Sequence, residues 1–364
     1  MAAMPNKMTI RDVAREAGVA VSTVSKVLNA SQRFTPDVES RVREAAERLA
    51  FRPNPHARSM TTGVSKTIGV VILDIENPYY AAVVKGASRE AATRGYTVLL
   101  ADTEESPQLE AQLIEALALR VDGLLLAGSR LPDAAIVALG SRDKPVVAVG
   151  RVPGGVISSV TSDEYSSAFQ LTRHLILTGR KRIAYLHGPK FWVDAQRHAG
   201  YGDALAEAGL KPLEWTLVSP NLEAGAALAG EVFLGARRVD AVLAYNDLAA
   251  LGLLRAAREL GVRVPEDIAV AGFGDIPFSA QASPPLTTAA APSLEIGRRA
   301  TALLIDRLAG GEGLSEPLVM PSRLIVREST RASRQALEKT SPRATEPRVT
   351  EPRVTATVQK RRPE

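Results

Sequence analysis

Residues 9–29 read TIRDVAREAGVAVSTVSKVLN. Thr9 suits the N-cap of a first helix, because its hydroxyl can accept a hydrogen bond from the first turn. After Thr9, apolar residues recur at i, i+3, i+4 and i+7, which places one stripe on one helix face. Gly18 ends this helix, since glycine readily adopts the left-handed conformation required there, and a second helix is predicted over 21–29. Two short helices around a tight turn form the helix-turn-helix arrangement, whose second helix enters the major groove of DNA.

The second predicted helix divides into two faces. Its apolar positions, Val24, Val27 and Leu28, can face inward. The positions left outside are Val21, Ser22, Ser25, Lys26 and Asn29. A third helix begins at Thr35 and Pro36, a cap followed by a residue suited to the first turn. A generic three-helix bundle with a solvated polar face gives the same pattern, so the pattern alone leaves both interpretations open.

Charge is unevenly distributed along the 364 residues. Residues 1–66 hold 11 Lys and Arg against 6 Asp and Glu, whereas residues 67–330 hold 25 against 30. Residues 331–364 hold 9 against 4. A basic head and a basic tail around an acidic body indicate that the ends meet a polyanion while the body has another role.

Composition excludes several classes of function. The chain has no cysteine, which rules out disulfides, thiolate catalysis and Cys-ligated metals, and fits a reducing cytoplasm. No apolar run is long enough to span a membrane, and the polar N-terminus does not resemble a secretory signal. The dinucleotide, P-loop and H-E-x-x-H patterns are missing, and the four histidines lie far apart in sequence. We therefore expect a cytoplasmic protein that is not an enzyme and has no catalytic residues, cofactor or metal.

The body predicts an α/β fold with two lobes. Short apolar runs alternate with helical stretches, as in parallel sheets that are buried on both faces. The predicted strands are Ile68–Leu73, Thr97–Ala101, Gly123–Ala127, Val146–Val149, Ile183–Leu186, Ala241–Tyr245 and Ile268–Ala271. Alternation over some 260 residues exceeds one such unit, so two lobes are expected.

Ligands of parallel sheets bind beyond the carboxyl ends of the strands. The loops predicted there carry carboxylates, amides, one arginine and aromatic rings, which suit a polyol ring. These loops are residues 74–80, Asp163 with Glu164, residues 188–197, Asn221, Asn246 with Asp247, and residues 272–275. A loop cap or turn explains Asn77-Pro78 and Asn246-Asp247 equally well.

Residues 9–29 resemble the headpiece of the lactose/purine-repressor (LacI/GalR) family of bacterial transcription regulators. The glycine turn and the run Thr23-Val24-Ser25 match the family pattern. The resemblance continues through FRPNPHARSM, residues 51–60, which is similar to the family's hinge, and covers the body to about residue 330. It implies a helix-turn-helix domain over 1–52, a hinge helix over 53–66, a two-lobed effector-binding and dimerisation domain over 67–330 that resembles periplasmic binding proteins, and a tail over 331–364.

The resemblance also implies how the head binds DNA. It assigns phosphate contacts to Thr9, Thr23, Ser25 and Asn29, and base reading to Val21, Ser22, Lys26 and Arg33. In the hinge it assigns DNA contacts to Asn54, Ala57 and Met60. Met60 stands where the family more often has a leucine that wedges into the minor groove, and methionine is apolar enough to do the same.

For the cleft, the resemblance assigns effector contacts to Tyr79, Tyr80, Arg197, Asn221 and Asn246, and the loops add Asp163 and Asp275. Other positions depart from the family pattern, among them Ala195, Pro220, Gly274 and Ala291. An atypical ligand, weak binding or no response to a ligand would each fit these departures. A sugar-like small molecule is the family default.

The tail contains a Pro-interrupted repeat, TEPRVT followed by EPRVT, which is typical of disorder. It lacks the leucine heptads that make some family members tetramers, so a homodimer is expected. The leading hypothesis is a repressor that binds a pseudo-palindromic operator in double-stranded DNA and whose affinity a small molecule modulates. The rival hypothesis is a cytoplasmic sugar-binding or sugar-processing protein whose head serves only dimerisation.

Overall fold

The computed structural model describes residues 8–29, 32–52, 63–150 and 157–331. Three helices form the head: α1 (Ile10–Ala17), α2 (Val21–Leu28) and α3 (Pro36–Arg48). Their apolar faces meet in a small core that includes Val13, Val24 and Val42. The three predicted helices are therefore confirmed.

The boundaries of α1 depend on two residues that the sequence singles out. Thr9 is the N-cap, and the Asp12 carboxylate accepts hydrogen bonds from the Thr9 backbone nitrogen (3.0 Å) and hydroxyl (2.7 Å). Gly18 ends the helix at a φ of 64°, a left-handed conformation that glycine adopts without a steric penalty. The tight turn that starts α2 three residues later thus rests on Gly18.

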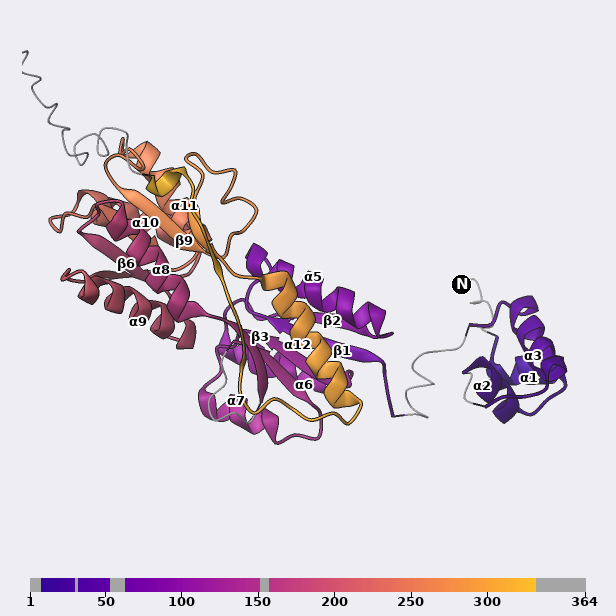
Figure 1. The fold of residues 1–364 in the computed structure, drawn as a ribbon. Coiled ribbons are helices and arrows are strands. Elements are labelled where there is room, and N and C mark those ends of the chain that lie inside the picture. Colours follow the sequence, from indigo (N-terminus) through magenta and orange to yellow (C-terminus); the bar gives the residue numbers. More distant parts are fainter. Residues whose placement is uncertain (1–7, 30–31, 53–62, 151–156, 332–364) are drawn as a thin grey trace, which may run out of the picture.

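The first lobe is a six-stranded sheet in the order β11-β5-β4-β3-β1-β2, with every pair of neighbours parallel. Its strands are β1 (Thr67–Ile72), β2 (Thr97–Asp102), β3 (Gly123–Ala127), β4 (Val146–Val149), β5 (Ser158–Ser162) and β11 (Leu318–Met320). Its helices are α5 (Pro78–Thr93), α6 (Pro107–Ala118), α7 (Asp133–Gly140) and α12 (Ser293–Leu308). Along β1, Val70 packs towards α5 and α12, and Val71 packs towards α6 and α7, so both faces are covered (Figure 1).

The second lobe repeats this plan in the order β12-β10-β9-β8-β6-β7, with only β12 antiparallel to its neighbour. Its strands are β6 (Ile183–His187), β7 (Leu213–Thr216), β8 (Ala241–Ala244), β9 (Ala269–Phe273), β10 (Thr287–Ala290) and β12 (Arg323–Ile325). Its helices are α8 (Glu164–Leu177), α9 (Trp192–Glu207), α10 (Leu222–Leu234), α11 (Asp247–Glu259) and the 3-10 turn η2 (Glu328–Thr330). On β6, Tyr185 packs towards α8 and α9, and Leu186 packs towards α10 and α11.

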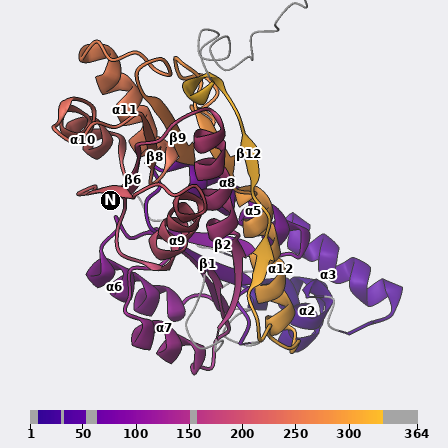
Figure 2. The same cartoon turned by 60° about the vertical axis from the view of Figure 1, so that its left-hand side comes forward.

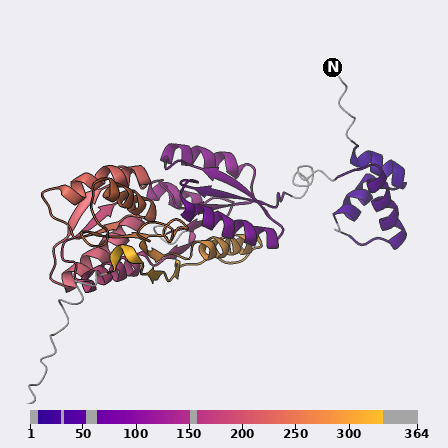
Figure 3. The ribbon, with the colours of Figure 1, turned by 90° about the horizontal axis from the view of Figure 1, so that it is seen from above.

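The chain crosses between the lobes three times. It passes from β5 to α8, returns from β10 to α12, and passes again from β11 to β12. Figure 2 shows this C-terminal part, coloured orange to yellow, running along both lobes, and Figure 3 shows the lobes end to end. The predicted two-lobed α/β architecture is confirmed. None of the described helices is long and apolar enough to cross a bilayer.

Each of the seven predicted strands is present, with boundaries that differ by one or two residues at most sites. The predicted Ile68–Leu73 is Thr67–Ile72, and the predicted Ile268–Ala271 is Ala269–Phe273. The structure contains five further strands that the sequence pattern does not predict: β5, β7, β10, β11 and β12. These strands are short or rich in hydroxyl groups, so they lack a continuous apolar run.

Glycines let the helices of each lobe approach closely. A Cβ on Gly297 of α12 would lie 2.0 Å from the Val83 carbonyl oxygen of α5. A Cβ on Gly252 of α11 would lie 2.0 Å from the Leu222 carbonyl oxygen of α10. These helix pairs therefore pack backbone against backbone.

Candidate functional site

The outer face of α2 carries the residues predicted to read bases. Val21 is 41% exposed, and Ser22 and Lys26 are exposed on the same helix. Val24 and Val27 point the opposite way and are fully or almost fully buried. The predicted division is therefore confirmed for these five residues, whereas Ser25, Leu28 and Asn29 are half-buried. The exposed face carries small side chains and one cation and can approach a groove closely.

The predicted phosphate-contacting residues lie around the helix ends. Thr9 precedes α1 and is exposed, and Asn29 follows α2. The Asn29 side-chain nitrogen donates to the Ser25 hydroxyl at 3.4 Å, which orients both groups. Thr23 is half-buried and Arg33 is exposed. The hinge residues Asn54, Ala57 and Met60 lie outside the described residues, as does the predicted tail beyond residue 331, so these predictions stay untested.

A cleft opens between the lobes, beyond the carboxyl ends of their strands. Its cavity volume is about 170 Å³, and the cleft is partly open to solvent. Four of the predicted effector residues line it: Tyr79, Tyr80, Arg197 and Asn246. The structure thus brings together side chains from α5, α9 and the start of α11.

The other three predicted effector residues are not among those that line the cleft. Asp163 and Asn221 are N-caps, and their side chains accept hydrogen bonds from the backbone of α8 and α10. The Asp275 carboxylate accepts a hydrogen bond from Arg327 at 2.7 Å. Each of these polar groups already has a partner in its own lobe, and no finding tests their contact with an effector.

Arg197 is held rigidly in the cleft. Its Nε donates to the Glu164 carboxylate at 2.7 Å, its Nη1 donates to the Tyr245 carbonyl oxygen at 2.5 Å, and its guanidinium lies 4.3 Å from the centre of the Phe273 ring. Burial opposes the charged form, but the Glu164 carboxylate together with the neighbouring Tyr245 and Tyr185 outweighs it, so the pKa of Arg197 is raised. The guanidinium is thus a fixed, charged hydrogen-bond donor.

Aromatic rings form much of the remaining wall. Tyr79 and Tyr80 meet edge to face, with centroids 5.2 Å apart. Burial raises the pKa of both hydroxyls, so both remain protonated at neutral pH and can donate. Tyr245 and Phe273 lie across the cleft in the second lobe. Such faces suit the apolar side of a ring-shaped ligand.

Arg130 links the two lobes. It follows β3 in the first lobe, where its side chain donates to Glu105 at 2.5 Å. Its guanidinium lies 4.5 Å from the centre of the Phe191 ring of the second lobe. Burial raises the pKa of Glu105 against the opposing effect of Arg130. A change in the distance between the lobes would therefore alter this contact directly.

Asp247 organises the loop after β9. Its buried carboxylate accepts hydrogen bonds from the Thr288 hydroxyl (2.6 Å), the Ser279 hydroxyl (2.7 Å) and the Ile276 backbone nitrogen (3.1 Å). Burial raises its pKa, although these bonds oppose the shift. The same loop contains Gly274, whose φ of 129° is a conformation that favours glycine.

Sequence reasoning missed several residues that line the cleft. Arg130 follows a predicted strand, but its loop carries no signal beyond a Gly-Ser turn. Phe191 and Trp192 lie within the predicted loop 188–197, yet nothing in the sequence separates them from core residues. The aromatic residue Tyr245 was placed inside a strand, and the structure places it just after β8.

Two family models match the chain. Residues 9–54 match the bacterial regulatory proteins of the lacI family, and residues 172–330 match a periplasmic binding protein-like domain. The first match covers the head, and the second covers most of the second lobe together with α12 and β11 of the first lobe.

Curated relatives match nearly the whole chain. The HTH-type transcriptional repressor CytR of Escherichia coli K12 is 34% identical over 335 residues, which cover 89% of this chain and 96% of that protein. The HTH-type transcriptional regulator CelR of Thermobifida fusca is 35% identical over 333 residues, which cover 88% and 98%.

Solved structures agree. A lac repressor dimer bound to operator and an anti-inducer has a TM-score of 0.81 at 26% identity, and the match covers 90% of this chain and 100% of that one. A complex of the regulator CelR with cellobiose has a TM-score of 0.67 at 33% identity, and the match covers 88% and 99%. The chain therefore belongs to the lacI family of bacterial regulatory proteins and is a DNA-binding transcriptional regulator of the helix-turn-helix type.

Proposed function

We propose that this regulator is a cytoplasmic repressor whose affinity for a pseudo-palindromic operator depends on an uncharged, sugar-like molecule bound between its lobes. The observation that carries the proposal is the cleft itself, which both lobes line with aromatic faces and fixed hydrogen-bonding groups. The proposed role requires no catalytic step.

The charges of the cleft favour an uncharged ligand. Arg197 is paired with Glu164, and Arg130 is paired with Glu105, so neither guanidinium requires an anionic partner. Each retains N–H groups that can donate to ligand hydroxyls. Trp192 lines the cleft, and its indole nitrogen is buried without a hydrogen-bond partner among the described residues. A buried donor of this kind is costly unless something accepts its hydrogen, and a ligand oxygen would do so.

In the head, we assign base reading to Val21, Ser22, Lys26 and Arg33, because these side chains are exposed on or next to α2. We assign phosphate contacts to Thr9, Thr23, Ser25 and Asn29. The hinge residues Asn54, Ala57 and Met60 would add minor-groove contacts. Phosphate contacts position the protein, and base contacts select the sequence.

A homodimer would place two heads on two half-sites, as in the lac repressor dimer bound to operator. The edge strand β2 supports this proposal, because Leu99 and Leu100 are 37% and 40% exposed. An exposed apolar edge strand is commonly covered by a partner.

A mobility-shift assay with the DNA upstream of the protein's own gene tests the head. Addition of neutral sugars, beginning with cellobiose and ribose, tests the cleft. We expect the protein to bind the upstream duplex more tightly than random duplex, and its affinity for DNA to fall steeply as the salt concentration rises. We also expect one class of sugar to change its affinity for the upstream duplex. A protein that binds sugars but shows no preference for any duplex would overturn the proposal in favour of a sugar-binding protein whose head only dimerises.

A further inference from the structure

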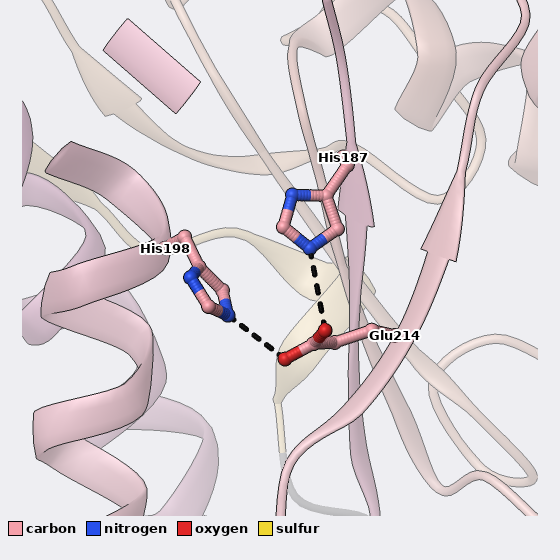
Figure 4. Close-up of side chains that lie close together, drawn as sticks. All are labelled: His187, His198 and Glu214. Carbon is pink, nitrogen blue, oxygen red and sulfur yellow. Dashed lines mark hydrogen bonds and ion pairs between the residues drawn. The ribbon is translucent and has the colours of Figure 1, made fainter. Parts of the chain in front are cut away.

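Three potential metal ligands meet on the second lobe (Figure 4). His187 ends β6, Glu214 lies on the neighbouring edge strand β7, and His198 lies on α9. The sequence separates them by up to 27 positions, so their spacing suggested no metal site. Pairing of β6 with β7 and packing of α9 on β6 bring them together, and their ligand atoms all lie within 4.8 Å of one another.

Both imidazole rings direct their Nε2 atoms at the Glu214 carboxylate. The His198 Nε2 lies 2.8 Å from Glu214 Oε1, and the His187 Nε2 lies 3.6 Å from Glu214 Oε2. Ligands of a tetrahedral Zn²⁺ with bonds of about 2.0–2.2 Å stand about 3.3 Å apart. The two separations lie on either side of that value, and the largest separation within the cluster is 4.8 Å, so the side chains would have to close on an ion to complete the geometry.

A buried carboxylate fixes the orientation of His187. Its Nδ1 lies 2.8 Å from Asp194 Oδ2, and Asp194 also accepts hydrogen bonds from the Tyr185 hydroxyl and the Gly188 backbone nitrogen. A metal-binding histidine usually donates its second ring N–H to a carboxylate in this way. With the Nδ1 proton directed at Asp194, a neutral His187 presents the Nε2 lone pair to Glu214. Two acceptors that face each other require a cation between them, either a proton or a metal ion.

We infer that His187, His198 and Glu214 form a site for a divalent transition-metal ion of the Zn²⁺ type, with Asp194 as the positioning residue. Two imidazole nitrogens and one carboxylate are a common donor set for zinc, and they leave a fourth position for water. The side chains of His198 and Glu214 are 41% and 40% exposed, so an ion can enter from solvent. This inference does not depend on the proposed function.

The site adjoins the effector cleft. The chain leads directly from His187 through Gly188, which Asp194 anchors, to Phe191 and Trp192 in the cleft wall. A bound metal ion would join β6, β7 and α9 at the base of this loop. It would thereby restrict movement of the loop that carries Phe191 and Trp192.

Zinc titration of the full-length, tag-free protein against a chromophoric zinc indicator tests the inference. We expect one Zn²⁺ per chain, and the exposed variants His198→Gln and Glu214→Gln should each weaken binding at least tenfold. The matched control His174→Gln removes a histidine of α8 whose Nε2 bonds to the Thr330 hydroxyl rather than to this cluster, and it should retain the stoichiometry and affinity of the unmodified chain.

Substitution with Co²⁺ provides an independent readout, because a four-coordinate site with nitrogen and oxygen ligands gives visible d–d absorption. That absorption should appear in the unmodified chain and in His174→Gln, and be lost in His198→Gln. Failure to bind stoichiometric Zn²⁺ at micromolar concentration would overturn the inference, as would unchanged affinity in both cluster variants. The cluster would then be two histidines bonded to a carboxylate.

Discussion

At the scale of single residues, side chains that are placed to contact DNA or a ligand differ from side chains that hold the protein's own helices in place. On α2, Lys26 is exposed on the outer face, whereas Asn29 lies at the helix end with its amide already oriented by Ser25. In the cleft, Arg197 is held by Glu164, whereas Asp163 and Asn221 serve the helices that they cap. Position within an element therefore decides which chemistry a residue can perform.

Replacement of Lys26 and of Asn29 should have different consequences for DNA binding. Lys26→Ala removes a donor for base acceptors, so discrimination between the operator and altered operators should fall by about 1–3 kcal/mol. Asn29→Ala removes the proposed phosphate contact, so all duplexes should be bound less tightly by a similar factor. Fluorescence anisotropy on the operator, a mutated operator and random DNA measures both. An equal loss on all three duplexes for both variants would contradict the division.

Arg197→Lys should abolish the effect of a cleft ligand on DNA binding while leaving the DNA-binding head intact. Lysine keeps the charge but cannot bond Glu164 and the Tyr245 carbonyl oxygen together, which leaves a buried acceptor unsatisfied at a cost of about 1–3 kcal/mol. We expect a lower midpoint of thermal unfolding and loss of the ligand response, with operator affinity retained. Arg173→Lys on the exposed face of α8 is the control. A full ligand response in Arg197→Lys would remove Arg197 from the binding site.

At the scale of elements, the sequence predicts what depends on local geometry. Thr9 and Gly18 define α1, and the apolar run 123–127 defines β3 without error, because a cap, a left-handed turn and a fully buried strand each leave a local pattern. The strand β5 escaped prediction because its sequence, Ser-Ser-Val-Thr-Ser, is polar although it is buried. The Ser158 hydroxyl accepts a hydrogen bond from the distant Leu314 N, whereas the Thr161 and Ser162 hydroxyls donate to acceptors close by in the sequence.

The close approach of α10 and α11 should be sensitive to a single methyl group. Gly252→Ala would push a Cβ into the backbone of α10 and should destabilise the protein by about 1–3 kcal/mol. Gly230→Ala in α10 meets no atom within 4 Å and should be neutral or stabilising, by up to about 1 kcal/mol, because alanine favours the helix. Urea unfolding of both variants separates the two effects. Equal destabilisation would show that the helices can move apart at little cost.

At the scale of the whole molecule, the cleft depends on contacts that no local pattern contains. Tyr79, Tyr80, Arg197 and Asn246 follow strands that the sequence predicts, so their shared location could be anticipated from the carboxyl ends of parallel strands. The contact of Arg130 with Phe191 could not, because it joins loops of different lobes. The same holds for His187, His198 and Glu214, which only the strand order and helix packing bring together.

Dimerisation should fail when the edge of the first sheet becomes charged. Leu100→Glu on β2 places a carboxylate on an apolar, solvent-exposed edge and should shift the protein from dimer to monomer in light scattering at micromolar concentration. Operator affinity should fall with it, since two linked heads bind far more tightly than one. Leu177→Glu, at a side chain that is 76% exposed on the second lobe, should leave the mass unchanged. A dimeric Leu100→Glu would exclude β2 from the interface.

The chain contains two tryptophans, and both belong to the second lobe. Trp192 lines the cleft, whereas Trp215 is buried and donates to Glu231 at 2.7 Å. The ultraviolet emission of the protein therefore combines a reporter in the cleft wall with a shielded internal reference. Occupancy of the cleft can be followed optically without a label, and Trp192→Phe should abolish the ligand-dependent change while the Trp215 emission remains.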